Sequence, residues 1–176
     1  RYRASRSRAG LAPTQQQGGS GIKWLLSQVA QATHGRLIGA DLEVTGVSTD
    51  TRTVTDGQLF IALSGERFDA HDFLDQAVAA GAAALLVSNE SKVPAGVSAV
   101  VVDDTRLALG RFAAAWRAQF DLPVIAVTGS NGKTTTKEMI ASILKAAFGA
   151  AVLSTRGNLN NDIGLPLTLL GLRASH

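Results

Sequence analysis

The sequence has no cysteine among its 176 residues. Disulfides, thiolate nucleophiles and cysteine-ligated metals are therefore excluded, and a reducing cytoplasm fits this composition. Histidine is scarce, and no two of His34, His71 and His176 have the spacing of a metal-binding pair. No apolar run approaches the roughly 20 residues that a membrane-spanning helix needs. These absences leave a globular protein whose chemistry must come from other side chains and from the backbone.

The net charge of +3 is concentrated at the N-terminus. Arg1, Arg3, Arg6 and Arg8 lie in a stretch without acids, and the other 13 basic and 14 acidic residues nearly cancel. The composition therefore gives no reason to expect a nucleic-acid-binding face. Residues 1–21 have little apolar content and end in a Gly/Ser stretch. We predict a disordered tail, which is either an added or upstream-translated segment or, as the alternative, a transit peptide.

The pattern after this tail alternates between helix and strand. A first unit, residues 22–103, is predicted to be a small α/β domain. Its helices are expected at 22–34 and 71–81, and its strands within 35–52, 57–63, 82–88 and 97–104.

A second unit, residues 104–176, is predicted to begin a parallel-sheet domain. It opens with a helix at 105–120, followed by an apolar strand at 122–129, a helix at 137–149 and a strand at 150–154. The order strand, glycine loop, helix, strand is that of a βαβ unit. We expect the helix at 137–149 to turn an apolar face inward, made of Met139, Ile140, Ile143, Leu144 and Phe148.

The stretch "TGSNGKTTT" (128–136) lies where that strand should hand over to the helix. Free backbone N–H groups and the helix dipole favour an anion there, and Gly129 and Gly132 let the backbone approach it closely. Lys133 adds a mobile positive charge, and Thr134 a hydroxyl for Mg²⁺. The spacing is G-x-x-G-K-T and not G-x-x-x-x-G-K-[ST], so a glycine turn with a chance lysine is the alternative. The phosphate-binding residues would be Gly129, Ser130, Asn131, Gly132, Lys133, Thr134 and Thr135.

Two strings carry a resemblance to a known family. "VIAVTGSNGKTTTKEM" (124–139) and "STRGNLNNDIGLPLTLLGL" (154–172) resemble the Mur ligases, whose loop has the short G-x-x-G-K-[ST] form. The segment "GNLNNDIGLP" (157–166) is similar to the branch that adds D-alanyl-D-alanine to UDP-N-acetylmuramoyl-tripeptide. Residues 47–87 resemble the N-terminal domain of the family, which holds the UDP end of the substrate. The resemblance covers residues 22–172 and implies an α/β UDP-binding domain followed by the start of a P-loop ATP-binding domain.

The resemblance implies ATP-dependent amide formation in cytoplasmic peptidoglycan-precursor synthesis. ATP would phosphorylate a substrate carboxylate, and the amine of D-alanyl-D-alanine would attack the acyl phosphate. Lys133 would be the catalytic residue, and Thr134 would hold Mg²⁺. The implied partners are small molecules, with neither nucleic acid nor membrane, and the full-length form would be a monomer.

The resemblance also implies a set of contacts with the UDP substrate. Purely structural roles remain open for these residues. They are a polar turn at residues 48–52, an Asx-rich turn in the asparagine cluster, and for Phe68 a place in the core, which we favour. His71 is expected to start a helix, and Asp50 to cap a turn or touch ligand. The implied contacts are Ser48, Thr49, Thr51, Arg52, Glu66, Arg67, Phe68, Asn158, Asn160 and Asn161.

The family resemblance implies that the chain is an N-terminal fragment. We therefore expect it to be inactive alone and prone to self-association. The alternatives are a non-catalytic UDP-sugar-binding module, another Mur-type ligase, and a different P-loop NTPase, for which no convincing acidic strand end is apparent.

Overall fold

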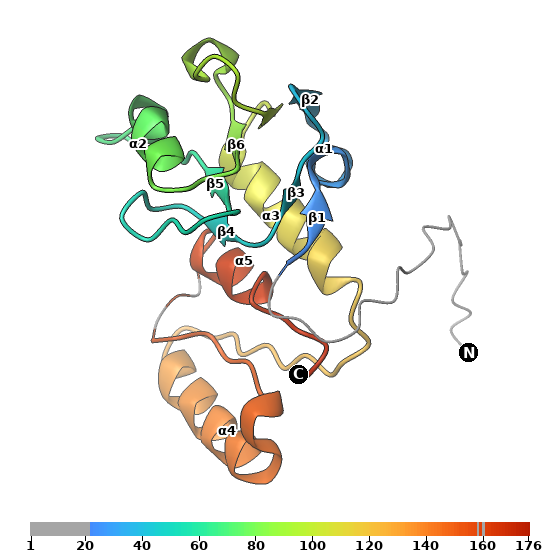
Figure 1. Ribbon diagram of the computed structural model, residues 1–176. Helices are drawn as coiled ribbons and strands as arrows, with labels where there is room; N and C mark the ends of the chain where they lie inside the picture. The colour runs from blue at the N-terminus through green and yellow to red at the C-terminus, as the bar shows by residue number, and fades with distance from the viewer. Residues whose placement is uncertain (1–21, 158, 160) are drawn as a thin grey trace, which may run out of the picture.

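The computed structural model describes residues 22–157, 159 and 161–176. Its centre is a five-stranded sheet with the order β2-β7-β6-β5-β4 (Figure 1). The four strands from β4 to β7 run parallel, and β2 closes one edge antiparallel to β7. The strands are β2 (Arg36–Ile38), β4 (Val47–Ser48), β5 (Leu59–Ile61), β6 (Ala84–Val87) and β7 (Ala99–Val101). The predicted α/β class is confirmed.

Helices cover both faces of this sheet. Successive strand residues point to opposite faces, so Leu59 and Ile61 pack on one side and Phe60 on the other. This double burial explains why "ALLV" of β6 is apolar throughout. One face is covered by α1 (Leu26–Thr33) and α3 (Thr105–Arg117), and the other by the 3₁₀ helix η1 (Ala70–Phe73) and α2 (Leu74–Ala79). A short antiparallel pair, β1 (Trp24–Leu25) with β3 (Glu43–Val44), borders α1, and a second 3₁₀ helix, η2 (Glu90–Lys92), follows β6.

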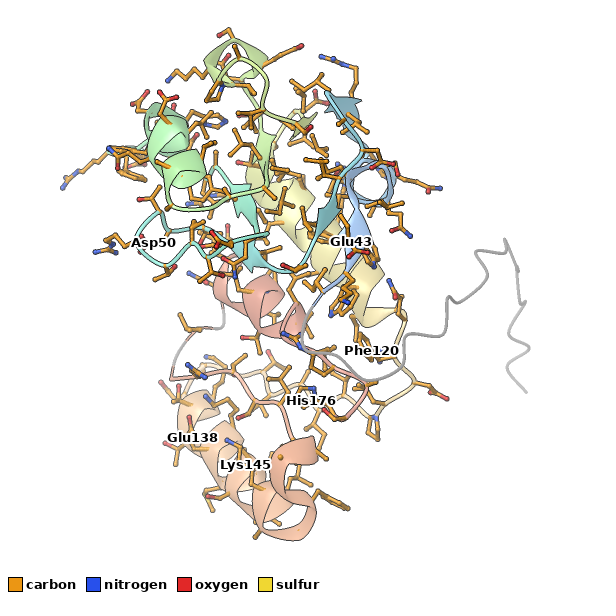
Figure 2. All side chains as sticks on the ribbon, viewed as in Figure 1. Glu43, Asp50, Phe120, Glu138, Lys145 and His176 are labelled. Atoms are coloured by element: carbon orange, nitrogen blue, oxygen red, sulfur yellow. The ribbon has the colours of Figure 1, made fainter. Side chains whose placement is uncertain are left out.

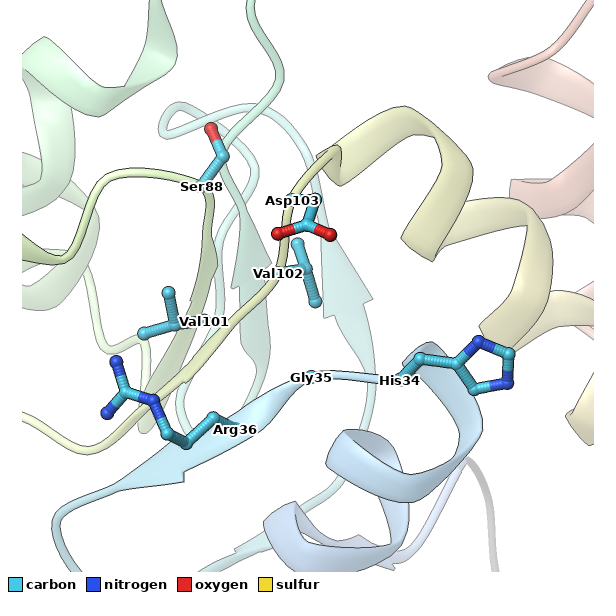
Figure 3. Close-up of a pocket in the computed structure, with 7 residues that line it drawn as sticks. All are labelled: His34, Gly35, Arg36, Ser88, Val101, Val102 and Asp103. Atoms are coloured by element: carbon cyan, nitrogen blue, oxygen red, sulfur yellow. The ribbon is translucent and has the colours of Figure 1, made fainter.

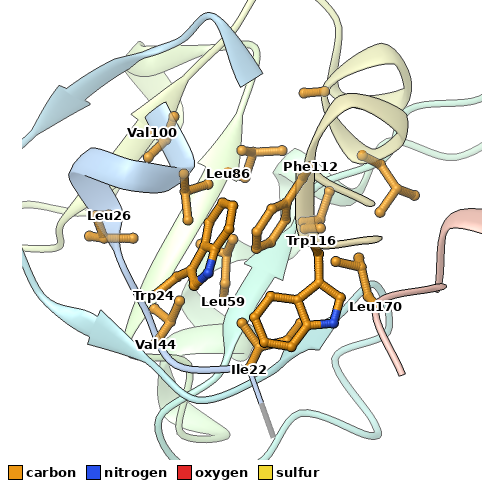
Figure 4. Close-up of a cluster of buried hydrophobic side chains, with 14 of the residues drawn as sticks. Ile22, Trp24, Leu26, Val44, Leu59, Leu86, Val100, Phe112, Trp116 and Leu170 are labelled. Carbon is orange, nitrogen blue, oxygen red and sulfur yellow. The ribbon is translucent and has the colours of Figure 1, made fainter. Parts of the chain in front are cut away.

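Aromatic side chains fill the larger core (Figure 4). The ring of Trp24 lies 5.1 Å from that of Phe112 and 6.0 Å from that of Trp116, measured between centroids. The helix predicted at 105–120 is present as α3, which ends at Arg117, and its residues Leu109, Phe112 and Trp116 are all buried. Figure 4 also shows Leu170 packed beside Trp116.

The helix α3 is a structural part of this core. Its first turn is capped by the Asp104 carboxylate, which accepts hydrogen bonds from the backbone N–H groups of Arg106 and Leu107. The helix α5 (Gly164–Leu169) packs against α3, and the indole N–H of Trp116 donates to the carbonyl of Leu172 at 3.2 Å. The domain boundary at residue 104 stays a prediction, although α3 shares its core with the sheet of the first unit.

The second unit contains the expected helix without the expected strands. Helix α4 (Lys133–Phe148) begins four residues earlier than predicted and leads into the 3₁₀ helix η3 (Gly149–Ala151). The predicted strands 122–129 and 150–154 are wrong for this structure, as is the βαβ unit, because within the described part of the chain neither segment pairs with another.

A strand needs neighbours, and two short candidates do not make a stable sheet in water. The consequence is visible in Figure 1, where α4 stands apart from the sheet with α5 between them. Of the expected inward face, Met139 is 62% exposed, Ile143 68% and Phe148 64%, whereas Ile140 and Leu144 are half-buried, so the prediction is wrong for three of its five residues. Within the described residues, no helix is both long and apolar enough to cross a membrane.

Candidate functional site

The glycine loop leads directly into the N-terminus of α4. Gly129 has φ +146° and Gly132 has φ +75°, and both values lie in the region that side-chain-bearing residues rarely adopt. Gly132 is the N-cap of α4, and its carbonyl accepts the first hydrogen bond of the helix, from Thr136 N–H at 3.0 Å. The N–H groups of the preceding helical residues have no intrahelical acceptor and point out of the helix end. This is the geometry in which a backbone binds an anion.

Lys133 is the first residue of α4, and its side chain folds back over the loop. Its ammonium donates hydrogen bonds to the carbonyls of Gly129 and, at 3.4 Å, Ser130. The charge of Lys133 therefore lies at the loop itself. Thr134 and Thr135 follow on the exposed first turn, and Asn131 lies within the loop. The structure thus brings the seven predicted phosphate-binding residues into one loop and helix start.

A second polar region lies at the carboxyl edge of the parallel sheet. Because β4, β5 and β6 are parallel neighbours, the loops that follow them leave the sheet at the same edge. Ser48 ends β4 and is buried, and its hydroxyl donates to the carbonyl of Asp50 at 3.0 Å. Thr49 and Thr51 are half-buried in the turn that follows. The predicted UDP contacts at 48–52 and 66–68 therefore emerge from adjacent strands.

The turn after β4 is organised by Asp50. Its carboxylate accepts from the backbone N–H of Arg52 at 2.9 Å and pairs with the Arg52 guanidinium at 2.6 Å. The hydrogen bond from the Arg52 side chain, with that from its N–H, lowers the pKa of Asp50 to about 2. Asp50 thus caps a turn, which was one of its two expected roles. Figure 2 shows Asp50 in this loop, far from Glu138 and Lys145 on α4.

The segment after β5 forms a small hairpin with an exposed tip. Ser64 bridges to Asp69, and the N–H of Gly65 donates to the carbonyl of Phe68 at 2.7 Å. Glu66, Arg67 and Phe68 make up the tip and are exposed. The core position favoured for Phe68 is wrong: the ring is 59% exposed and stacks on Phe73, with 5.2 Å between centroids and 13° between planes. A stacked exposed ring is suited to contact a ligand.

The asparagine segment is described in part. Asn158 and Asn160 lie outside the described residues. The side-chain oxygen of Asn161 accepts from the N–H groups of Ile163 at 3.3 Å and Gly164 at 2.7 Å, which forms an Asx turn just before α5, as the turn alternative predicted. Asp162 pairs with Arg106 of α3 at 3.0 Å.

An open pocket of about 480 Å³ lies at the carboxyl edge of the parallel strands, where β6, β7 and β2 meet (Figure 3). Arg36, Ser88 and Asp103 line it together with His34, a C-cap residue with φ +59°. Sequence reasoning missed it because its lining residues come from three separate segments. Sequence reasoning also missed Lys137, whose ammonium donates hydrogen bonds to the carbonyls of Thr155 and Gly157. Lys137 lies four residues after Lys133 and hence on the same face of α4. Nowhere in the described ranges do three or more His, Asp or Glu side chains gather as a metal site.

Comparison with known families assigns both parts of the chain. Residues 43–117 match the family described as "Mur ligase family, catalytic domain", and residues 127–176 match "Mur ligase middle domain". The chain belongs to the Mur ligase family. The second match begins two residues before Gly129, so the loop geometry lies within the Mur ligase middle domain.

Curated Mur ligases and solved structures agree with this assignment. The UDP-N-acetylmuramoyl-tripeptide–D-alanyl-D-alanine ligase of Escherichia coli strain K12 is 54% identical over 151 residues, which are 86% of this chain and 32% of that protein. A crystal structure of MurF from Acinetobacter baumannii has a TM-score of 0.80 at 46% identity, covering 90% of this chain and 35% of that one. The MurF ligase from Thermotoga maritima in complex with ADP has a TM-score of 0.63 at 35% identity, covering 70% of this chain and 28% of that one. This chain spans about a third of the length of these Mur ligases.

Proposed function

We propose that the protein to which this chain belongs is an ATP-dependent ligase that joins D-alanyl-D-alanine to UDP-N-acetylmuramoyl-tripeptide in the cytoplasm. The observation that carries this proposal is the loop at 129–132, where two glycines at positive φ lead into α4 with Lys133 as its first residue. The substrates for which the related ligases are named support the substrate of this proposal, and the ADP in the Thermotoga structure supports the nucleotide. The acceptor and donor are small molecules, and the full-length form is proposed to be a monomer.

The residues of the loop fit a nucleotide phosphate. A phosphate oxygen would accept from the N–H groups at the start of α4, and the Lys133 ammonium would move from the loop carbonyls onto the outer phosphate. Thr134 would offer its hydroxyl to Mg²⁺. ATP supplies the phosphoryl group that activates a carboxylate, and the transfer needs charge neutralisation and positioning more than a protein nucleophile. Lys133 is the catalytic residue in this proposal.

The carboxyl edge of the first sheet is proposed to hold the UDP end of the substrate. The loop that follows β4 at this edge contains Thr49, Thr51 and Arg52. The hairpin with Arg67 and Phe68 at its tip follows the neighbouring strand β5 at the same edge. Two guanidinium groups suit a diphosphate, and an exposed aromatic ring suits a uracil face. Ser48, Glu66, Asn158, Asn160 and Asn161 complete the proposed substrate contacts.

The chain alone is proposed to bind ligands without ligating them. Val124 and Ile125, just before the loop, are 56% and 60% exposed, and among the described residues their segment pairs with no strand that would hold the loop in a fixed position. Phosphoryl transfer depends on such positioning. With ATP, Mg²⁺, UDP-N-acetylmuramoyl-tripeptide and D-alanyl-D-alanine, the 176-residue chain should release no phosphate above the blank.

Calorimetric titration with UDP and, separately, with ADP and Mg²⁺ tests the two sites. We expect Lys133→Met to abolish ADP binding and leave UDP binding intact, and Arg52→Met to do the reverse. Matched controls are Lys145→Met at the far end of α4 and Arg111→Met on α3, both exposed in the structure. Each control should bind both nucleotides like the unmodified chain.

The pattern of binding separates the candidate functions. Binding of UDP without ADP would favour the non-catalytic UDP-sugar-binding module, for which the unpaired segment before the glycine loop is the supporting observation. Binding of ADP without UDP would contradict the proposed UDP site and leave the proposed nucleotide site standing. Binding of neither nucleotide would contradict the proposed function.

A further inference from the structure

The hairpin 64–69 has a fixed base below its exposed tip. The Ser64 hydroxyl donates to Asp69 Oδ1 at 2.9 Å, which reinforces the backbone bridge between the same two residues. Lys92, on η2, approaches Asp69 Oδ2 at 3.4 Å. The backbone N–H of His71, and then its ring and Ser64, hold the pKa of Asp69 well below its usual range. The base of the hairpin is therefore organised around a carboxylate.

His71 joins this base to the neighbouring strand. Its side chain is buried, with the residue 4% exposed, and its Nδ1 lies 2.6 Å from Asp69 Oδ1. On the other side of the ring, Nε2 accepts the backbone N–H of Ser88 at 2.9 Å. A ring nitrogen that accepts an N–H carries no proton, so the proton lies on Nδ1 and is donated to Asp69. Both ring nitrogens of His71 are therefore engaged.

The contacts run from a carboxylate (Asp69) to an imidazole (His71) to a hydroxyl (Ser88), as in nucleophilic catalytic triads. Ser88 Oγ lies 3.4 Å from His71 Nε2. A general base needs its lone pair free to take the hydroxyl proton. Here the lone pair is directed at the backbone N–H of Ser88, whose nitrogen is 2.9 Å away and so closer than the hydroxyl. The arrangement is therefore a structural bridge and not a hydrolytic site.

We propose that His71 is a positioning residue that fixes the hairpin tip for the UDP end of the substrate, an inference that rests on the proposed function. Strands β5 and β6 are parallel neighbours, so the hairpin after β5 and Ser88 after β6 lie at the same edge of the sheet. The bridge spans these two loops and thereby restrains Arg67 and Phe68 at the tip. A ligand then binds a loop that is already ordered, and less entropy is lost on binding.

Two substitutions separate the two halves of the bridge. The amide of His71→Gln reaches about as far as Nε2, so it can accept from Ser88 N–H, whereas that of His71→Asn reaches only as far as Nδ1. We expect His71→Asn to weaken UDP binding about tenfold and His71→Gln to stay within about threefold of the unmodified chain. Thr33→Val is the matched control, because Thr33 is also a buried polar residue of this unit, bonded to the carbonyl of Val29 at 2.7 Å in α1.

The readouts are UDP affinity by calorimetry and amide exchange by NMR. In His71→Asn the N–H groups of Ser88 and Gly65 should exchange about tenfold faster, while Thr33→Val should leave both rates and the UDP affinity unchanged. Unaltered UDP affinity in His71→Asn, or a ring proton found on Nε2 by nitrogen NMR, would overturn the proposal. If the unmodified chain does not bind UDP, the proposed function fails, while unchanged exchange of Gly65 in His71→Asn would separately show that His71 does not hold the hairpin.

Discussion

Lys137, in the second turn of α4, donates a hydrogen bond to the main-chain carbonyl of Gly157 at 2.6 Å. It also donates to the carbonyl of Thr155 at 2.7 Å. One ammonium thus ties the helix that follows the glycine loop to the segment that leads into the asparagine cluster. The two regions that the sequence marked as candidate sites in the second unit are held together by a residue assigned to neither.

We expect Lys137→Met to release residues 155–157 from α4. Methionine keeps the length of the side chain and removes the donor, so the loss reports on the hydrogen bonds. Amide exchange in residues 155–157 should rise at least about tenfold, because two hydrogen bonds from a charged group are lost and even one of them is worth about a factor of ten. Lys137→Arg should restore most of the protection, and Lys145→Met provides the control on the same helix. Equal protection in Lys137→Met and the unmodified chain would show that these bonds do not hold the segment.

Trp116 should be among the most costly side chains to truncate. It is buried between Trp24, Phe120 and Leu170, and its indole N–H bonds the carbonyl of Leu172. Trp116→Ala is expected to lower the free energy of unfolding by about 3–5 kcal/mol. Trp116→Phe keeps an aromatic ring but removes the donor, so a loss of about 1–3 kcal/mol is expected. Urea denaturation followed by far-ultraviolet circular dichroism gives both values.

The control for Trp116 is Phe68→Ala. Because the Phe68 ring is exposed at the hairpin tip, its removal should change the free energy of unfolding by no more than about 0.5 kcal/mol. A large loss for Phe68→Ala with a small one for Trp116→Ala would mean that the hydrophobic core is elsewhere.

The ion pair of Asp50 and Arg52 predicts a low carboxyl pKa that can be measured directly. A pKa of about 2 in the folded chain lies below the ordinary value of about 3.9, so the ionised form is favoured by folding. This contribution is fully present above about pH 4 and is lost as the pH falls toward about 2. In Arg52→Met the Asp50 pKa should rise toward its ordinary value in a carbon-detected NMR titration. An unchanged pKa would show that Arg52 is not the cause.

The strands of the five-stranded sheet could be predicted because their residues are apolar, as strands buried on both faces require. Leu85 and Leu86 point to opposite faces, and each face has a helix to cover it, so an unbroken apolar run was the correct signal. Val124 and Ile125 carry the same signal and form no strand. A local pattern shows that a segment would suit a sheet, but pairing depends on neighbours that a local pattern does not describe.

The candidate site was predictable to the extent that it is local in sequence. The glycine loop, the positive charge of Lys133 and the turn at Asp50 each depend on residues within a few positions of one another. The bond between His71 and Ser88 spans 17 residues and depends on the register of β5 with β6, which periodicity does not fix. The solvent-exposed stack of Phe68 on Phe73 was missed for a related reason, since an aromatic residue in a short loop suits the core equally well.

Two glycines should respond in opposite ways to alanine. Gly110 lies inside α3, and no atom lies within 4 Å of the place that an alanine methyl group would take, so Gly110→Ala should raise the free energy of unfolding by about 0.5–1 kcal/mol. Gly132 has equal space but φ +75°, where an L side chain costs about 1–2 kcal/mol. Gly132→Ala should therefore weaken ADP binding about tenfold, measured by calorimetry. The idea fails if Gly132→Ala binds ADP like the unmodified chain.

The exposed apolar face of α4 should cause self-association of this chain. Met139, Ile143 and Phe148 are 62%, 68% and 64% exposed, and Val124 and Ile125 are also uncovered. Exposed apolar side chains of this kind associate because burial removes them from water. Light scattering after size exclusion should show a mass that rises with concentration, and Ile143→Lys should shift it toward the monomer. Gln119→Lys, an exposed polar position after α3, controls for the added charge and should leave the association unchanged. A monomer at every concentration would mean that this face is covered in solution.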